Sequence, residues 1–147
     1  MSLKKKFKTD SALANDGVWF DYPGQPNEDG TVPGFKLARK GSQNKAYTKA
    51  MREFTLAHTD DEGNYNTDNM TEEDAEAVEL NVFVDGLLME WRNFQPEDDG
   101  NVLEFSKEAA REVFGDPDWF DLRADLAKRC GHADAFKTAQ LKGEAKN

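Results

Sequence analysis

The stretch VELNVFVDGLLMEW, residues 78–91, decides the predicted fold of this chain. Wound as an α-helix, it carries apolar side chains on nearly every side, namely Val78, Leu80, Val82, Phe83, Val84, Leu87, Leu88, Met89 and Trp91. A helix that is apolar all round is buried, so we predict one central helix here. Gly86 lies inside it at a cost of about 1 kcal/mol relative to alanine, and we interpret this glycine as a point of close packing.

The predicted start of this helix is at Thr71. The Thr71 side chain can accept hydrogen bonds from amides of the first turn. Glu72, Glu73 and Asp74 place negative charge where the helix dipole favours it. The spacing from Thr71 to Asp74 is that of a capping box, although Glu or Gln is more usual than Asp at the second position.

Two short strands are predicted before the helices. Residues Val18–Tyr22 and Phe35–Lys40 are rich in aromatic and apolar side chains. The segment between them, PGQPNEDGTVPG, is dense in proline, glycine, asparagine and aspartate, which favours a loop. The simplest arrangement is an antiparallel pair with a long connecting loop.

Helical spacing and capping signals predict further helices over Gln43–Ala57, over Ser106–Phe114, from Asp116 to Cys130 and in a last short segment through Phe136 and Leu141. The predicted fold is therefore mainly α, with about five helices around a buried central helix and a small N-terminal antiparallel β pair. We expect a flexible basic N-terminal segment (residues 1–14), a single helical domain (15–141) and a flexible C-terminal tail (142–147).

Composition restricts the class of protein. The 147 residues fit one domain, which could bury roughly two thirds of the surface of its unfolded chain. A net charge of −10 disfavours nucleic-acid binding, because the phosphate backbone would be repelled. The single cysteine, Cys130, excludes an internal disulfide and fits a reducing cytoplasm. No apolar run approaches the ~20 residues needed to cross a bilayer. We therefore expect a soluble cytoplasmic protein that binds neither nucleic acid nor membrane.

Acidic residues are concentrated in one part of the chain. Between Arg52 and Arg92 there is no lysine or arginine, and the acidic residues there are Glu53, Asp60, Asp61, Glu62, Asp68, Glu72, Glu73, Asp74, Glu76, Glu79, Asp85 and Glu90. We favour the interpretation that they form a solvated face that keeps the protein soluble. The alternative is a surface that attracts a basic partner or mimics nucleic acid.

Signals for catalysis or metal binding are missing. An EF-hand loop needs an acid at its first position, a glycine at the sixth and a glutamate at the twelfth, and this pattern fails when Gly30, Gly63 or Gly100 is set at the sixth position. Cys130 and His132 are close in sequence, but His58 is the sole further soft ligand, which is too few for zinc. There is no nucleophile elbow and no phosphate-binding glycine loop. We predict no metal, no cofactor and no enzymatic activity.

The order of these elements carries a resemblance. It is seen in GVWFDY (residues 17–22), KLARKGSQNKAYTKAM (36–51), LLMEW (87–91) and NVLEFSKEAAREVFGDPDWF (101–120). The individual residues on which the resemblance rests are Gly17, Trp19, Arg39, Gly41, Asn44, Trp91, Gly100, Phe105, Ser106, Ala110 and Asp116. Across about residues 15–136, the chain resembles the small tail assembly chaperones of long-tailed, siphovirus-type bacteriophages.

The resemblance implies a function without catalysis. A chaperone of this family binds the tape-measure protein and keeps it soluble during tail assembly, before tail tube subunits polymerise around it. The major tail tube protein and a second copy of the chain are further candidate partners. The resemblance also implies that the protein acts in the host cell cytoplasm and is absent from the mature virion.

Aromatic side chains are the predicted partner-binding residues, because they dominate interface energetics. The candidates are Trp19, Tyr22, Trp91, Phe94, Trp119 and Phe120. For Trp91 and Trp119 we favour the simpler interpretation of core packing. The alternative function is a small acidic phage inhibitor, or DNA mimic, that acts on a host protein. The clustering of acids in the polar loop before Thr71 fits that alternative poorly.

Overall fold

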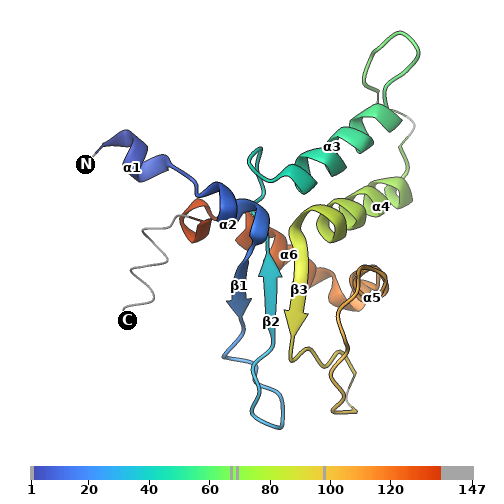
Figure 1. The fold of residues 1–147 in the computed structure, drawn as a ribbon. Coiled ribbons are helices and arrows are strands. Elements are labelled where there is room, and N and C mark those ends of the chain that lie inside the picture. Colours follow the sequence, from blue (N-terminus) through green and yellow to red (C-terminus); the bar gives the residue numbers. More distant parts are fainter. Residues whose placement is uncertain (1, 67, 69, 98, 137–147) are drawn as a thin grey trace.

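The computed structural model describes residues 2–66, 68, 70–97 and 99–136. Its elements are α1 (Leu3–Phe7), α2 (Ser11–Asp16), β1 (Val18–Asp21), β2 (Gly34–Leu37), α3 (Lys45–Ala57), α4 (Glu72–Val82), the π-helical turn η1 (Phe83–Leu87), β3 (Leu88–Arg92), α5 (Lys107–Phe114), the 3₁₀ turn η2 (Pro117–Trp119), α6 (Phe120–Cys130) and the 3₁₀ turn η3 (Ala133–Phe136). Figure 1 shows α3 and α4 extending beyond the end of the sheet at which β3 begins.

The sheet has three strands in the order β1-β2-β3, and both neighbouring pairs are antiparallel. Trp19 lies opposite Lys36 in the first pair. Phe35 lies opposite Trp91 in the second pair. The predicted antiparallel pairing of the first two strands is confirmed, although both strands are shorter than expected.

The predicted central helix is wrong, and the fold class changes with it. Residues 72–82 do form α4, but none of them is buried. The backbone widens into the π-helical turn at Phe83 and becomes extended at Leu88, so that Trp91 belongs to β3. A continuous apolar run suits a buried strand as well as a buried helix, and pairing with β2 selects the strand. The protein is therefore mixed α and β, with a three-stranded sheet, rather than mainly α.

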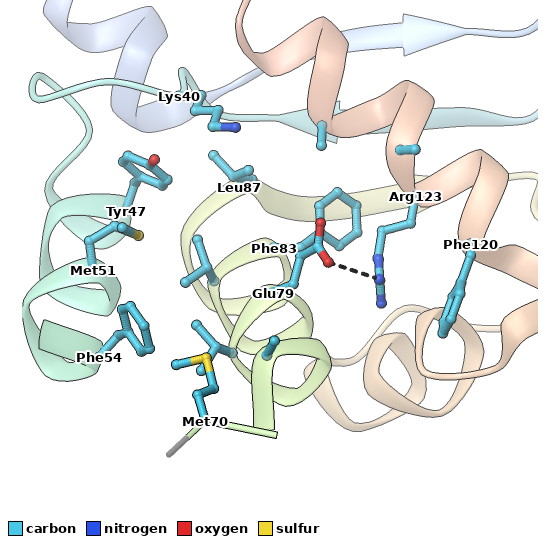
Figure 2. Close-up of a pocket in the computed structure, with 15 residues that line it drawn as sticks. Lys40, Tyr47, Met51, Phe54, Met70, Glu79, Phe83, Leu87, Phe120 and Arg123 are labelled. Carbon is cyan, nitrogen blue, oxygen red and sulfur yellow. Dashed lines mark ion pairs between the residues drawn. The ribbon is translucent and has the colours of Figure 1, made fainter. Parts of the chain in front are cut away.

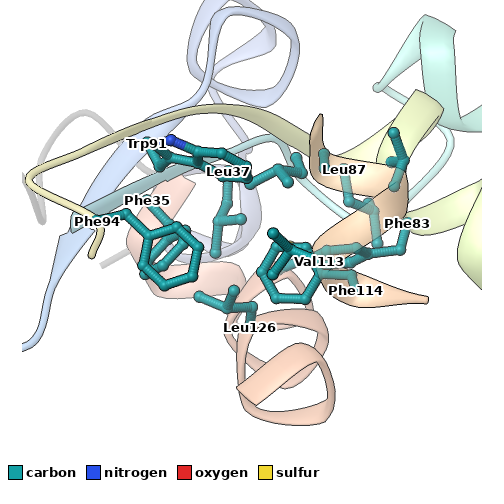
Figure 3. Packing of buried hydrophobic residues seen from close by; sticks show 13 residues of the cluster. Phe35, Leu37, Phe83, Leu87, Trp91, Phe94, Val113, Phe114 and Leu126 are labelled. Atoms are coloured by element: carbon teal, nitrogen blue, oxygen red, sulfur yellow. The ribbon is translucent and has the colours of Figure 1, made fainter. Parts of the chain in front are cut away.

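The core lies between the sheet, η1, α5 and α6, with Phe35 of β2 at its centre (Figure 3). Ring centroids 5.3–6.4 Å from that of Phe35 belong to Tyr22, Trp91, Phe94 and Phe114. All four pairs are edge-on, the geometry that the ring quadrupoles favour. The Trp91 indole N–H donates to the Leu103 carbonyl at 2.7 Å. Burial of this tryptophan therefore leaves no unsatisfied donor.

Capping side chains start the helices largely where predicted. The capping box at Thr71 is confirmed, because its hydroxyl accepts from the Asp74 amide at 3.1 Å and the Asp74 carboxylate accepts from the Thr71 amide at 3.3 Å. Ser106 caps α5 by accepting from the Ala109 amide at 3.0 Å. Asp116 caps the 3₁₀ turn η2, which precedes α6. None of the described helices is both long enough and apolar enough to span a bilayer.

The residue that precedes α2 contacts the last described residue of the chain. The Asp10 amide donates to the Phe136 carbonyl at 3.0 Å. Ala14 of α2 is fully buried, and its carbonyl accepts from the Arg39 amide at 3.0 Å. The predicted last helix is a 3₁₀ turn in its described part, Ala133–Phe136. Leu141 and the predicted C-terminal tail, residues 142–147, lie outside the described residues.

A candidate partner-binding groove

An open apolar groove of about 410 Å³ lies between α3, α4 with η1, and α6 (Figure 2). Its apolar lining is formed by Tyr47, Met51, Phe54, Met70, Ala75, Val78, Val82, Phe83, Leu87, Phe120, Ala124 and Ala127. Lys40, Glu79 and Arg123 are the charged residues of its wall. An apolar groove with few charges is the form that a site for another protein's apolar side chains takes.

The wall of the groove that α3 contributes is a stripe of apolar side chains along one face of this helix. Tyr47, Met51 and Phe54 recur at the spacing that aligns side chains along a helix. All three are half-buried. Figure 2 shows them pointing toward the side chains of α4 and η1.

The N-terminus of α3 is anchored by Asn44. This side chain is 1% exposed, and its amide donates to the carbonyls of Arg39 at 2.9 Å and Gly86 at 2.7 Å. Its oxygen caps the helix by accepting from the Tyr47 amide at 3.1 Å. Gly86 allows η1 to approach α3 this closely, because a Cβ at position 86 would lie 2.9 Å from the Tyr47 Cα. The expected close packing at Gly86 is thus present, but in η1 and against α3.

Arg123 of α6 lines the groove and connects α6 to α4. Its guanidinium forms a two-pronged ion pair with Glu76 and donates to the Phe114 carbonyl at 2.9 Å. Glu79 approaches it at 3.7 Å, and the Phe120 ring centroid lies 4.4 Å from its central carbon. The hydrogen bonds from Arg123 hold the pKa of the Glu76 carboxyl below its ordinary value. Arg123 is 6% exposed. A buried guanidinium would destabilise the fold without partners of this kind, because its charge has lost its contact with water.

The helices that form two walls of the groove have no buried residue. This holds for all of α3 and all of α4, although each carries apolar side chains toward the other. α3 extends from its anchored N-terminus along α4 (Figure 1). Among the residues that the structure describes, the apolar faces of both helices are therefore only partly covered, and a further apolar surface would complete their burial.

The predicted partner-binding rings are distributed over the molecule. Phe120 lines the groove. Trp91 and Phe94 are each 4% exposed and belong to the core. Trp19 is half-buried at the sheet, with the Arg92 guanidinium carbon 4.2 Å from its ring centroid.

Three of these rings come together in a second cavity. Tyr22, Phe94 and Trp119 line a space of about 450 Å³ next to α6. The Phe94 and Trp119 centroids are 5.3 Å apart. Tyr22 and Trp119 are half-buried, and each presents part of its ring to the cavity. The structure therefore joins residues that are 97 positions apart in the chain (22 and 119).

Sequence analysis missed the main lining residues of the groove. Met51 and Phe54 belong to the helix predicted over Gln43–Ala57, but neither was among the candidate partner-binding residues. Met70 was placed in a polar loop. A usable signal was present in the two methionines, because flexible thioether side chains are common on surfaces that adapt to a partner.

The single cysteine of the chain is enclosed by the core. Cys130 is buried, and burial raises the pKa of its thiol to about 12. The thiol is thus protonated at neutral pH and is a poor nucleophile. Within the described ranges, no group of three or more His, Cys, Asp or Glu side chains is placed to hold a metal ion.

Comparison with known proteins identifies a matching protein family. A family model described as YdaY prophage protein matches residues 42–147. The matched range contains α3, α4, η1 and α6, and thus nearly the whole lining of the groove. No curated protein and no solved structure matches the chain significantly.

Proposed function

We propose that this chain, which belongs to the YdaY prophage protein family and is therefore phage-derived, acts as a tail assembly chaperone. It would hold an apolar helical segment of the tape-measure protein in the groove between α3, α4 and α6. It would release that segment as the tail tube assembles, act in the host cytoplasm and be absent from the finished particle.

The observation that carries this proposal is the incomplete burial of α3 and α4. Both helices point apolar side chains into an open groove, yet neither has a buried residue. An amphipathic helix laid into the groove would cover Tyr47, Met51 and Phe54 on one side and Val78 and Val82 on the other. Binding of a helix in a groove is a common way to shield an aggregation-prone apolar stripe.

Charge supports a partner with basic flanks. Glu79 of α4 lines the groove, and Glu53 on α3 and Glu72 and Glu73 on α4 are exposed on the two helices that form its walls. Such a rim accelerates encounter with a segment that carries lysine or arginine beside its apolar face. The same charges repel duplex DNA.

The test is co-expression with the tape-measure protein of the same prophage. Wild-type protein should raise the soluble fraction of the tape-measure protein. Met51→Asp should lose most of this effect, because it places a charge in the groove. Leu56→Asp is the matched control, since Leu56 is on the same helix and 66% exposed, and it should behave as wild type.

Two results would contradict the proposal in different ways. An unchanged soluble fraction with wild-type protein would rule out the chaperone function. A fully active Met51→Asp variant would show that the groove is not the binding site. If the protein instead displaced duplex DNA from a host DNA-binding protein, the alternative of an acidic inhibitor would be preferred.

A further inference from the structure

Helix α6 separates two cavities. Phe120, Ala124 and Ala127 face the groove. Asp121, Leu122 and Asp125 line the second cavity. At 100° per residue these two sets lie on opposite sides of the helix, so the second cavity is a separate surface.

The second cavity combines aromatic rings with carboxylates. Its rings are those of Tyr22, Phe35, Phe94 and Trp119, and its acids are Asp121 and Asp125. The Asp125 carboxylate is already engaged, because it accepts from the Tyr22 hydroxyl at 2.5 Å and from Arg129 at 3.0 Å. Asp121 is exposed, and in the part of the chain that the structure describes it makes no ion pair.

The protein itself repeatedly places arginine between a ring and a carboxylate. Arg92 contacts Trp19 at 4.2 Å and Asp21 at 3.0 Å. Arg129 contacts Tyr22 at 4.7 Å and Asp125 at 3.0 Å. In each case the planar guanidinium stacks on the ring face and donates to the acid.

Arg123 follows the same rule in the groove, between Phe120 and Glu76. Trp119 and Asp121 supply a ring and a carboxylate that both line the second cavity. Among the described residues no arginine or lysine contacts the Trp119 ring. Tryptophan is also the ring that attracts cations most strongly.

We propose that the second cavity binds an arginine side chain of a partner protein. The guanidinium stacks on Trp119 and donates to the Asp121 carboxylate, while the aliphatic part of the side chain lies against Leu122 and Pro33. The net charge of −10 favours such a basic ligand over an acidic one. The inference does not depend on which segment occupies the groove.

The probe is the peptide acetyl-Gly-Arg-Gly-amide, titrated at low salt and followed by the indole N–H signals in NMR spectra of the whole protein. The Trp119 signal should shift and that of the buried Trp91 should not. The counterpart with norleucine in place of arginine should not bind. The lysine counterpart should bind more weakly than the arginine peptide, because a compact ammonium does not stack.

Variants locate the site. Asp121→Asn should weaken binding of the arginine peptide at least about threefold, in the range of an exposed ion pair. Asp118→Asn is the matched control, because Asp118 is exposed, three residues away and outside the cavity lining. Trp119→Leu should abolish saturable binding while the other two indole signals keep their native positions.

Two outcomes overturn the inference. Equal weakening by Asp121→Asn and Asp118→Asn would mean general attraction to an acidic protein. Equal binding of lysine and arginine peptides would rule out stacking on Trp119. Met51→Asp should bind the arginine peptide as wild type does, so a failure of the groove proposal and a failure of this one give different results.

Discussion

The Lys107 side chain contacts the backbone where it changes from the π-helical turn η1 to strand β3. In an α-helix the Leu88 amide would donate to the Val84 carbonyl, but in η1 it donates to Phe83 instead. The Lys107 ammonium takes up the free acceptor, because it donates to the carbonyls of Val84 and Leu88 at 2.5 Å each. Burial of this ammonium lowers the pKa of Lys107.

The first residue-scale prediction concerns this lysine. Lys107→Met keeps the aliphatic stem but leaves two partly buried carbonyls without their donor, so the free energy of unfolding should fall by about 1–3 kcal/mol. Urea unfolding at pH 7 measures this change. Lys128→Met, at an exposed lysine of α6, should alter stability much less, and equal effects of the two variants would contradict the role of Lys107.

Among the elements, α4 and α6 are joined by the ion pair between Glu76 and Arg123. No residue of α4 is buried, so this contact adds to the packing of Leu80 against the core. Arg123 also donates to the Phe114 carbonyl at the end of α5. Helices α4, α5 and α6 are therefore connected by one guanidinium, which also lines the groove.

Replacement of Glu76 tests this connection. Glu76→Gln should lower the free energy of unfolding at pH 7 by about 1–3 kcal/mol, because the buried Arg123 loses its charged acceptor. The pKa of Glu76 is lowered in the folded protein. The stabilisation is therefore present above the ordinary glutamate pKa and is lost as the pH falls through the folded value.

The difference between wild type and Glu76→Gln should accordingly shrink below about pH 4.5. Urea unfolding across pH 3–7 measures it. Glu73→Gln, at an exposed glutamate of the same helix, is the control and should show no such dependence. A difference that stays constant down to pH 3 would argue against the ion pair.

The whole molecule consists of a well-packed body and a less buried arm. The body contains the sheet, η1, α5 and α6 around Phe35, which is 1% exposed. The arm is formed by α3 and α4, which have no buried residue. Local opening requires less free energy where fewer apolar contacts are lost, so the two parts should differ in stability.

Native-state hydrogen exchange tests this difference. Amides in the last two turns of α3 should exchange at least about tenfold faster than those of β2, because the contacts of α3 with the body at Asn44 and Tyr47 lie at its N-terminal end. Binding of the tape-measure segment should slow exchange in α3 and α4 and leave β2 unchanged. Uniform protection across α3 and β2 in the free protein would contradict the division into body and arm.

Local signals in the sequence were sufficient for the helix starts and for the first strand pair. The hydrogen bonds at Thr71, Ser106 and Asp116 span only two or three residues, so each depends on its own short segment. The loop between the first two strands is likewise marked by its own composition. These features could be predicted because the interactions that stabilise them lie within the segment.

The route of residues 78–91 was decided only by tertiary structure. A run of apolar residues is compatible with a buried helix and with a buried strand. Here the strand is stabilised by the pairing of Trp91 with Phe35 and by the hydrogen bond from Lys107 to the Leu88 carbonyl. The groove also combines α3, α4 and α6, which no sequence spacing connects. Composition and charge alone suggested a protein partner, whereas long-range packing determined which apolar side chains of the described residues remain uncovered, because burial depends on neighbours distant in the chain.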